Sequence, residues 1–94
     1  MQYDIRHNAE ASRFETRVDE ATALTEYRIE GDQLNILHTL VPRAIEGRGI
    51  ASALVQAAYD YALCNGLIPT ATCSYAIAWL DRHPDYKKAP NKER

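Results

Sequence analysis

Hydrophobic and polar positions alternate along the first forty residues, which is the pattern of half-buried β-strands. Residues 11–18 and 21–30 each place apolar or hydroxyl side chains on one face and mostly charged ones on the other. Gly31-Asp32 follows the second run and is the residue pair expected in a type II′ hairpin turn. Residues 33–41 carry apolar side chains on both faces, as an internal strand does. The short connections predict an antiparallel meander of three strands.

The periodicity changes to that of a helix after Gly49. Apolar residues recur at helical spacing from Ile50 to Ala62, and a single polar stripe follows the remaining side. We expect Gly66 to end this helix, because glycine readily adopts the left-handed conformation that follows a helix C-terminus.

A short strand and a second helix are expected next. Residues 67–72 are a strand candidate, although Pro69 cannot donate to a ladder. A second helix is expected over residues 75–82, and Pro84 stops it. Strand, helix and strand from Leu34 to Thr72 form a βαβ unit, whose two strands should be parallel with a right-handed crossover. The fold class predicted is α/β with a small mixed sheet.

Composition bounds this prediction to one domain. The chain has 94 residues, of which 46% are hydrophobic and 26% charged, and this suits one hydrophobic core. We expect the core domain over residues 10–86 and a charged tail over 87–94. The formal net charge of −2 gives no reason to expect a nucleic acid or an anionic membrane as partner.

The cysteine count favours a cytoplasmic protein, and so do the charged residues at the start of the sequence, where a signal peptide would be apolar. Cys64 and Cys73 are too few for a disulfide scaffold, and both thiols are expected to be free. No spacing of cysteine and histidine suggests a metal site. Residues 61–80 lack charge over a length that could cross a membrane. Hydroxyl residues, Asn65-Gly66 and a proline interrupt this run, so we expect a buried segment of a soluble fold.

The segment between the third strand and the first helix, residues 41–52, is the most informative one. Its glycines allow a sharp turn and a close approach of a ligand to the backbone. The first amides of a helix lack internal partners and lie at the positive end of the helix dipole. Arg43 and Arg48 can add charge. These features predict a site for a phosphate or diphosphate group.

Three phosphate-binding loops can be compared with this segment. A Walker A motif is absent, and a dinucleotide fingerprint would require an acidic residue about 20 residues further on, where none lies between Tyr61 and Leu80. The third pattern, [Q/R]xxGx[G/A], is the pyrophosphate loop of the GNAT superfamily of acyl-CoA-dependent N-acetyltransferases. Residues 46–51, Glu-Gly-Arg-Gly-Ile-Ala, resemble it, with Glu46 in place of the usual glutamine or arginine.

The resemblance extends over about residues 35–86, to a short single-domain group of GNAT proteins. It is carried by His38-Thr39 before the loop, the helix of small residues, Pro69, Cys73 and His83-Pro84-x-Tyr86. It implies that acetyl-CoA lies between splayed parallel strands and that its pantetheine pairs with the backbone near Leu40 and Val41. The residues expected to bind the cofactor are Leu40, Val41, Arg43, Glu46, Gly47, Arg48, Gly49, Ile50, Ala51, Ser52 and Cys73.

Compared with longer superfamily members, the sequence has no room for a last hairpin after the second helix. We therefore expect part of the acceptor pocket to be missing, or to be supplied by a second subunit in a homodimer.

Three residues are candidates for catalysis. Cys73 follows a parallel strand and opens a helix, where ligands bind and thiol pKa values fall. It is a candidate acetyl acceptor, positioning group or acid, or else a packed thiol. Tyr75 is a candidate proton donor to the departing thiolate, with packing as the alternative. His38 alternates with Leu34 and Ile36, which predicts a covered core position, with a general base as the alternative.

The function expected is acetyl transfer from acetyl-CoA to an amine. The acceptor is left open among a polyamine, an amino sugar, an amino acid and a protein lysine. The alternative is a non-catalytic acyl-CoA-binding module with a regulatory or sensing role. Cys64, in the first helix, is expected to be a buried structural thiol.

Overall fold

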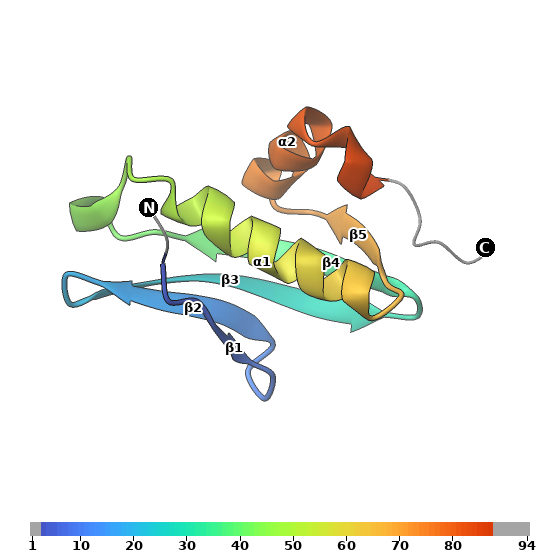
Figure 1. The fold of residues 1–94 in the computed structure, drawn as a ribbon, viewed down its shortest axis with the longest axis horizontal. Coiled ribbons are helices and arrows are strands. Elements are labelled where there is room, and N and C mark those ends of the chain that lie inside the picture. The colour runs from blue at the N-terminus through green and yellow to red at the C-terminus, as the bar shows by residue number, and fades with distance from the viewer. Residues whose placement is uncertain (1–2, 88–94) are drawn as a thin grey trace.

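The structure, a computed structural model, describes residues 3–87. Five strands form one sheet in the order β1-β2-β3-β4-β5 (Figure 1). The strands are β1 (Arg6–Asn8), β2 (Arg13–Val18), β3 (Ala21–Glu30), β4 (Gln33–Leu40) and β5 (Ile68–Ala71). The helices are α1 (Ile50–Cys64) and α2 (Ser74–Arg82), with 3-10 turns η1 (Arg43–Ile45) and η2 (Pro84–Lys87). The expected charged tail lies outside the described residues, apart from its first residue.

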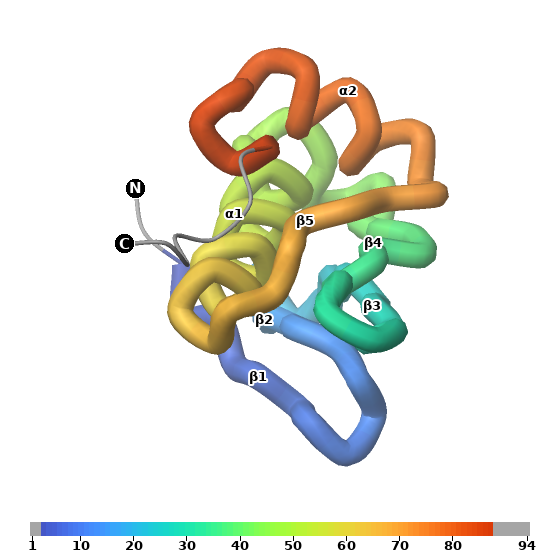
Figure 2. Tube along the Cα trace, turned by 90° about the vertical axis from the view of Figure 1, so that its right-hand side faces the viewer, coloured from blue at the N-terminus to red at the C-terminus, as the bar shows by residue number. Residues whose placement is uncertain are grey.

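The mixed α/β class is confirmed, and the meander is one strand longer than expected. β1 to β4 pair antiparallel in sequence order, and β5 pairs parallel to β4. β1 was missed because its three residues are too few to show an alternating pattern. The sheet curves around α1, and α2 lies past the β5 side (Figure 2).

Both long hairpins use two-residue turns, and positive φ suits Gly31 better than it suits Glu20, which carries a Cβ. Asp19 and Glu20 join β2 to β3 with φ of 50° and 68°, which is the arrangement of a type I′ turn. Gly31 joins β3 to β4 with φ of 61° and is followed by Asp32, which has no positive φ, as expected for type II′. These primed turns match the right-handed twist of the strands.

The core lies between α1, the facing side of the sheet and α2. Its fully buried side chains each contribute about 1.5–3 kcal/mol relative to exposure. The largest are Trp79, Tyr59, Leu34, Ile36, Ile45, Ile50, Leu54 and Val55.

A β-bulge at Leu37 reverses the facing of β4 halfway along the strand. Tyr27 pairs with Ile36 and Glu26 pairs with His38, which leaves Leu37 without an opposite residue. His38 therefore points away from α1, and its side chain is 59% exposed. The expected core position of His38 is wrong, because strict alternation does not allow for the extra residue.

β4 and β5 part immediately after this bulge. Their parallel register runs from Gln33 opposite Ile68 to Ile36 opposite Ala71. The amides of Thr72 and Cys73 then both donate to the carbonyl of Ile36, at 3.0 and 3.2 Å. Within the described residues, β4 has no strand partner on this side beyond Ile36.

Pro69 fits in β5 because its nitrogen faces away from β4. The amide of Ile68 donates to Asp32, and that of Thr72 donates to Ile36. Donors to β4 therefore fall on even-numbered residues, so Pro69 costs no ladder bond.

The uncharged run of residues 61–80 is divided among the end of α1, β5 and the start of α2. None of the helices in the described residues combines the length and apolar character needed to cross a membrane.

His7 on β1 makes the stability of the fold depend on pH. Its ring stacks on Phe14 with centroids 4.2 Å apart, and its Nε2 lies 2.6 Å from the hydroxyl of Tyr27. His7 is an exposed residue, but this packing shields part of the ring from water and lowers the pKa of His7 below 6.5. The unfolded chain therefore binds the proton more readily, and stability is lost as pH falls through 6.5 and below.

We expect the free energy of unfolding, measured in urea at about pH 7.5 and about pH 5, to fall more in the wild-type chain than in His7→Phe. Phenylalanine keeps the stacking on Phe14 but does not titrate. Equal losses in the two chains would show that His7 is not responsible.

Candidate functional site

A cleft opens where β4 and β5 part, beside the N-terminus of α1. Its volume is about 470 Å³, which is the size of a small-molecule site. It is lined by Thr39, Leu40, Val41, Glu46, Gly47, Gly49, Ile50, Ala51, Ser52 and Tyr75. The structure thus brings the end of β4, most of the expected loop and the first turn of α2 around one space.

The N-terminus of α1 presents unused amides to this cleft. Gly47 and Gly49 have φ of 80° and 76°, which bring the chain round into the helix. No side chain caps α1, and Ala53 is the first residue whose amide bonds back, to the carbonyl of Gly49. Within the described residues, the amides of residues 50–52 have no protein acceptor. This is the arrangement that binds anions at helix N-termini.

The two loop arginines do not line the cleft. Arg48 forms an ion pair of 2.8 Å with Asp19 in the β2–β3 hairpin, and its carbonyl accepts a hydrogen bond from Tyr3. Arg43 is exposed on η1. Glu46 does line the cleft, so the positive potential there comes from the backbone of α1.

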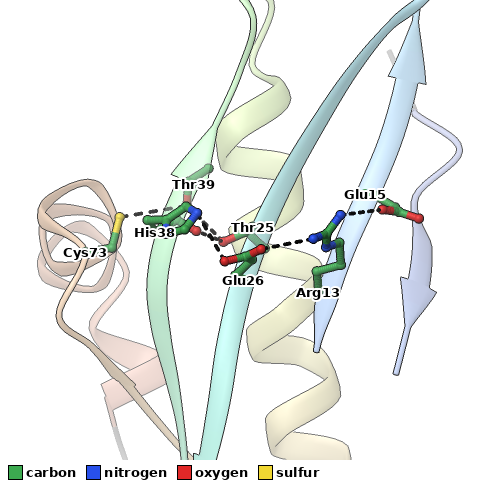
Figure 3. A network of polar contacts seen from close by, with 7 residues as sticks. All are labelled: Arg13, Glu15, Thr25, Glu26, His38, Thr39 and Cys73. Carbon is green, nitrogen blue, oxygen red and sulfur yellow. Dashed lines mark hydrogen bonds and ion pairs between the residues drawn. The ribbon is translucent and has the colours of Figure 1, made fainter. Parts of the chain in front are cut away.

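Cys73 contacts the cleft wall through a chain of hydroxyl groups (Figure 3). It is the N-cap residue of α2 and is half-buried. Its thiol donates to Thr39 Oγ1 at 3.8 Å, and this hydroxyl lies 2.9 Å from that of Thr25. Thr25 is fully buried and donates to the carbonyl of His38 at 3.3 Å. Thr39 is a site residue that was missed in the sequence, where its place between His38 and Leu40 was the only signal.

The first turn of α2 is held against the loop. Tyr75 lines the cleft, and the buried indole of Trp79 donates to Ser52 Oγ at 2.9 Å. On the core side of β5, Tyr59 donates to the carbonyl of Thr70 at 2.6 Å. Burial raises the pKa of Tyr59, so its hydroxyl remains a donor that supports β5.

His38 belongs to a row of polar side chains on the face of the sheet opposite α1 (Figure 3). Its Nε2 lies 3.2 Å from Glu26 Oε1. Glu26 Oε2 lies 3.1 Å from Arg13, whose guanidinium also approaches Glu15 at 3.7 Å. His38 itself does not line the cleft, but Leu40, two residues on, does.

The remaining candidates are placed away from the cleft. Cys64 is exposed at the end of α1, so the expectation of a buried thiol is wrong: Cys64 follows Asp60 by four residues and continues the exposed polar stripe of the helix. Both thiols are free, as expected. Among residues 3–87, no group of three or more histidine, cysteine and acidic side chains is placed to hold a metal.

Comparisons with known proteins identify the family of this chain. The family described as GCN5-related N-acetyl-transferase matches residues 13–89. The chain belongs to the GCN5-related N-acetyltransferase family. It is 32% identical to Protein NATD1 of Xenopus tropicalis over 84 residues, which cover 85% of this chain and 76% of that protein. The human NATD1 is also 32% identical over 84 residues, with coverage of 85% and 74%.

A solved GNAT structure confirms the fold. The NMR solution structure of a GCN5-like protein from Staphylococcus aureus, described as a candidate N-acetyltransferase, superimposes with a TM-score of 0.72. The two sequences are 27% identical, and the match covers 98% of this chain and 91% of the other. The family resemblance seen in the loop is therefore confirmed over the whole fold.

The two thiols should differ in reactivity. We expect iodoacetamide to modify the exposed Cys64 several times faster than the half-buried Cys73, whose S–H is bonded to Thr39. Peptide mass spectrometry over a time course measures both rates, and Cys64→Ser isolates the rate of Cys73. Faster labelling of Cys73 would reveal a thiolate and contradict the hydrogen-bonded thiol.

Proposed function

We propose that this chain transfers an acetyl group from acetyl-CoA to a primary amine. The observation that carries the proposal is the pair of unused hydrogen-bonding edges at the cleft. One consists of the free backbone amides at the start of α1. The other is the backbone edge of β4 that is no longer paired with β5 beyond Ile36. In a pantetheine diphosphate, the diphosphate suits the free amides of α1, and the amide groups of pantetheine suit the unpaired side of β4.

Two features of the cleft support the binding of acetyl-CoA. The amides of residues 47–52 would receive the diphosphate, and the left-handed glycines leave the backbone accessible. The amide groups of pantetheine would pair with β4 near Leu40 and Val41, as an added strand does. Glu46 opposes a diphosphate electrostatically, so its side chain would turn toward solvent, where it is already exposed.

The reacting end would lie between β4 and the first turn of α2. Tyr75 lines the cleft there and is our candidate proton donor to the departing CoA thiolate. Cys73 would position the thioester through its contact with Thr39. His38 would accept the proton that the amine loses. Main-chain donors near Val41 would face the oxygen on which negative charge develops.

A non-catalytic acyl-CoA-binding module is the second candidate. The position of His38 outside the cleft lining and the hydrogen-bonded thiol of Cys73 favour it. The two functions differ in one measurement: an enzyme releases CoA when an amine is offered, whereas a module binds acetyl-CoA without turnover.

Replacing Gly49 tests the loop. Gly49→Ala places alanine at a φ of 76°, which costs about 1 kcal/mol of stability. Gly66→Ala is the matched control, because Gly66 has a φ of 72° and follows the C-terminus of α1. No protein atom lies within 4 Å of an added Cβ at either position, so internal clashes are not a factor. We expect both variants to unfold at similar urea concentrations, but only Gly49→Ala to weaken acetyl-CoA binding, by about tenfold in calorimetry. Equal affinity in all three chains would remove the loop from the site.

Replacing Cys73 tests the reacting end. We expect Cys73→Ala to lower kcat about tenfold, equivalent to about 1.4 kcal/mol on the barrier, with little change in Kd for acetyl-CoA. Cys73→Ser keeps a donor toward Thr39 and should retain most activity if the thiol only positions the thioester. If serine is as damaging as alanine, the sulfur itself takes part. Unchanged turnover in Cys73→Ala would exclude any role.

A further inference from the structure

We propose that the acceptor amine reaches the cleft from the sheet face opposite α1, and that Glu26 is the residue that positions His38 there to take its proton. Arg13 in turn holds Glu26. This inference rests on the transfer reaction proposed above and adds to it the side from which the acceptor approaches.

The β4 bulge separates two sides of the site. The free amides for the diphosphate belong to α1, on one side of the sheet. The extra residue, Leu37, turns His38 and Leu40 to the other side, where Leu40 is 55% exposed. Leu40 also lines the cleft, so the cleft lies next to this second face. His38 stands two residues along the same face, about 7 Å away by strand spacing.

Glu26 fixes the orientation of the imidazole. The register of β3 and β4 places Glu26 directly opposite His38, and one carboxylate oxygen of Glu26 lies 3.2 Å from Nε2. In a neutral ring, this close contact favours the proton on Nε2, which leaves the lone pair of Nδ1 to accept another. An imidazole without this partner would rotate freely, since the side chain is 59% exposed.

Arg13 in turn holds the carboxylate. Its Nη2 donates to Glu26 at 3.1 Å, from the neighbouring position on β2. Both side chains are less exposed than that of His38, at 32% for Arg13 and 28% for Glu26. The Nε of Arg13 is buried and has no protein acceptor in the part of the chain described. Leaving a buried donor unpaired costs free energy. The charged contacts of Arg13 with Glu26 and Glu15 offset this cost and keep the arginine in place.

The transfer step balances with these residues. The amine nitrogen forms a bond to the thioester carbon, and the carbon–sulfur bond breaks. The proton lost by nitrogen passes to His38 Nδ1, directly or through one water. The CoA sulfur leaves as a thiolate and takes a proton from Tyr75. His38 and Tyr75 then return to their starting states by exchange with solvent.

The test compares two glutamates that contact the same arginine. Glu26→Gln removes the carboxylate next to His38, whereas Glu15→Gln, with a side chain of similar exposure, removes only the longer of the two ion pairs of Arg13, at 3.7 Å. CoA release is measured by chromatography with acetyl-CoA and, in turn, spermidine, glucosamine and Nα-acetyl-lysine amide. We expect kcat to fall about tenfold or more in Glu26→Gln, with an unchanged KM for acetyl-CoA, and to change much less in Glu15→Gln, because Arg13 keeps its shorter contact with Glu26.

Two further variants separate positioning from folding. Glu26→Asp should recover part of the lost rate, and Glu26→Gln combined with His38→Gln should be no slower than His38→Gln alone. Additive losses, or equal rates in Glu26→Gln and Glu15→Gln, would overturn the inference while leaving the transferase intact. If the wild-type chain binds acetyl-CoA but releases no CoA with any of the amines, the proposed activity fails, and the inference fails with it.

Discussion

The carbonyl of Ile36 is the point on which the site depends. It accepts from both Thr72 and Cys73, and these are the last backbone hydrogen bonds that join β4 to the segment after β5. Each such bond contributes only about 1 kcal/mol, yet together they end the parallel pairing at a defined residue. Beyond Ile36 the chain turns into α2, and β4 is left with one unpaired side. The cleft, the position of Cys73 and the placing of Tyr75 all follow from this early parting of two strands.

The bulge at Leu37 lets the side chains of β4 serve both faces of the sheet. A regular strand would direct Ile36, His38 and Leu40 into one core, and the sheet would have a single functional side. One extra residue lets Thr39 join the buried hydroxyl pair with Thr25 while His38 meets Glu26 on the other face. One short strand, β4, thus combines an unpaired backbone edge with side chains that reach both faces of the sheet.

Much of this architecture is readable in the sequence. Alternation predicted β2 to β4, helical spacing predicted α1, and the glycine spacing of residues 46–51 indicated the loop that lines the cleft. What was missed has a common cause. The bulge, the ion pair of Arg48 with Asp19 and the contact of Cys73 with Thr39 arise between segments far apart in sequence, and local periodicity contains no information about them. The exposure of Cys64 is different, because its spacing of four residues from Asp60 placed it on the polar stripe of α1 and could have been read from the sequence.

The two margins of the sheet have a consequence for the behaviour of the protein in concentrated solution. β1 offers only three residues, and the proline of β5 places a ring where an outward amide would stand. Neither edge strand presents a long row of free backbone N–H and C=O groups with which a strand of another molecule could pair. Self-assembly by strand addition is therefore suppressed at both ends, even though the cleft requires one strand side to remain open within the molecule.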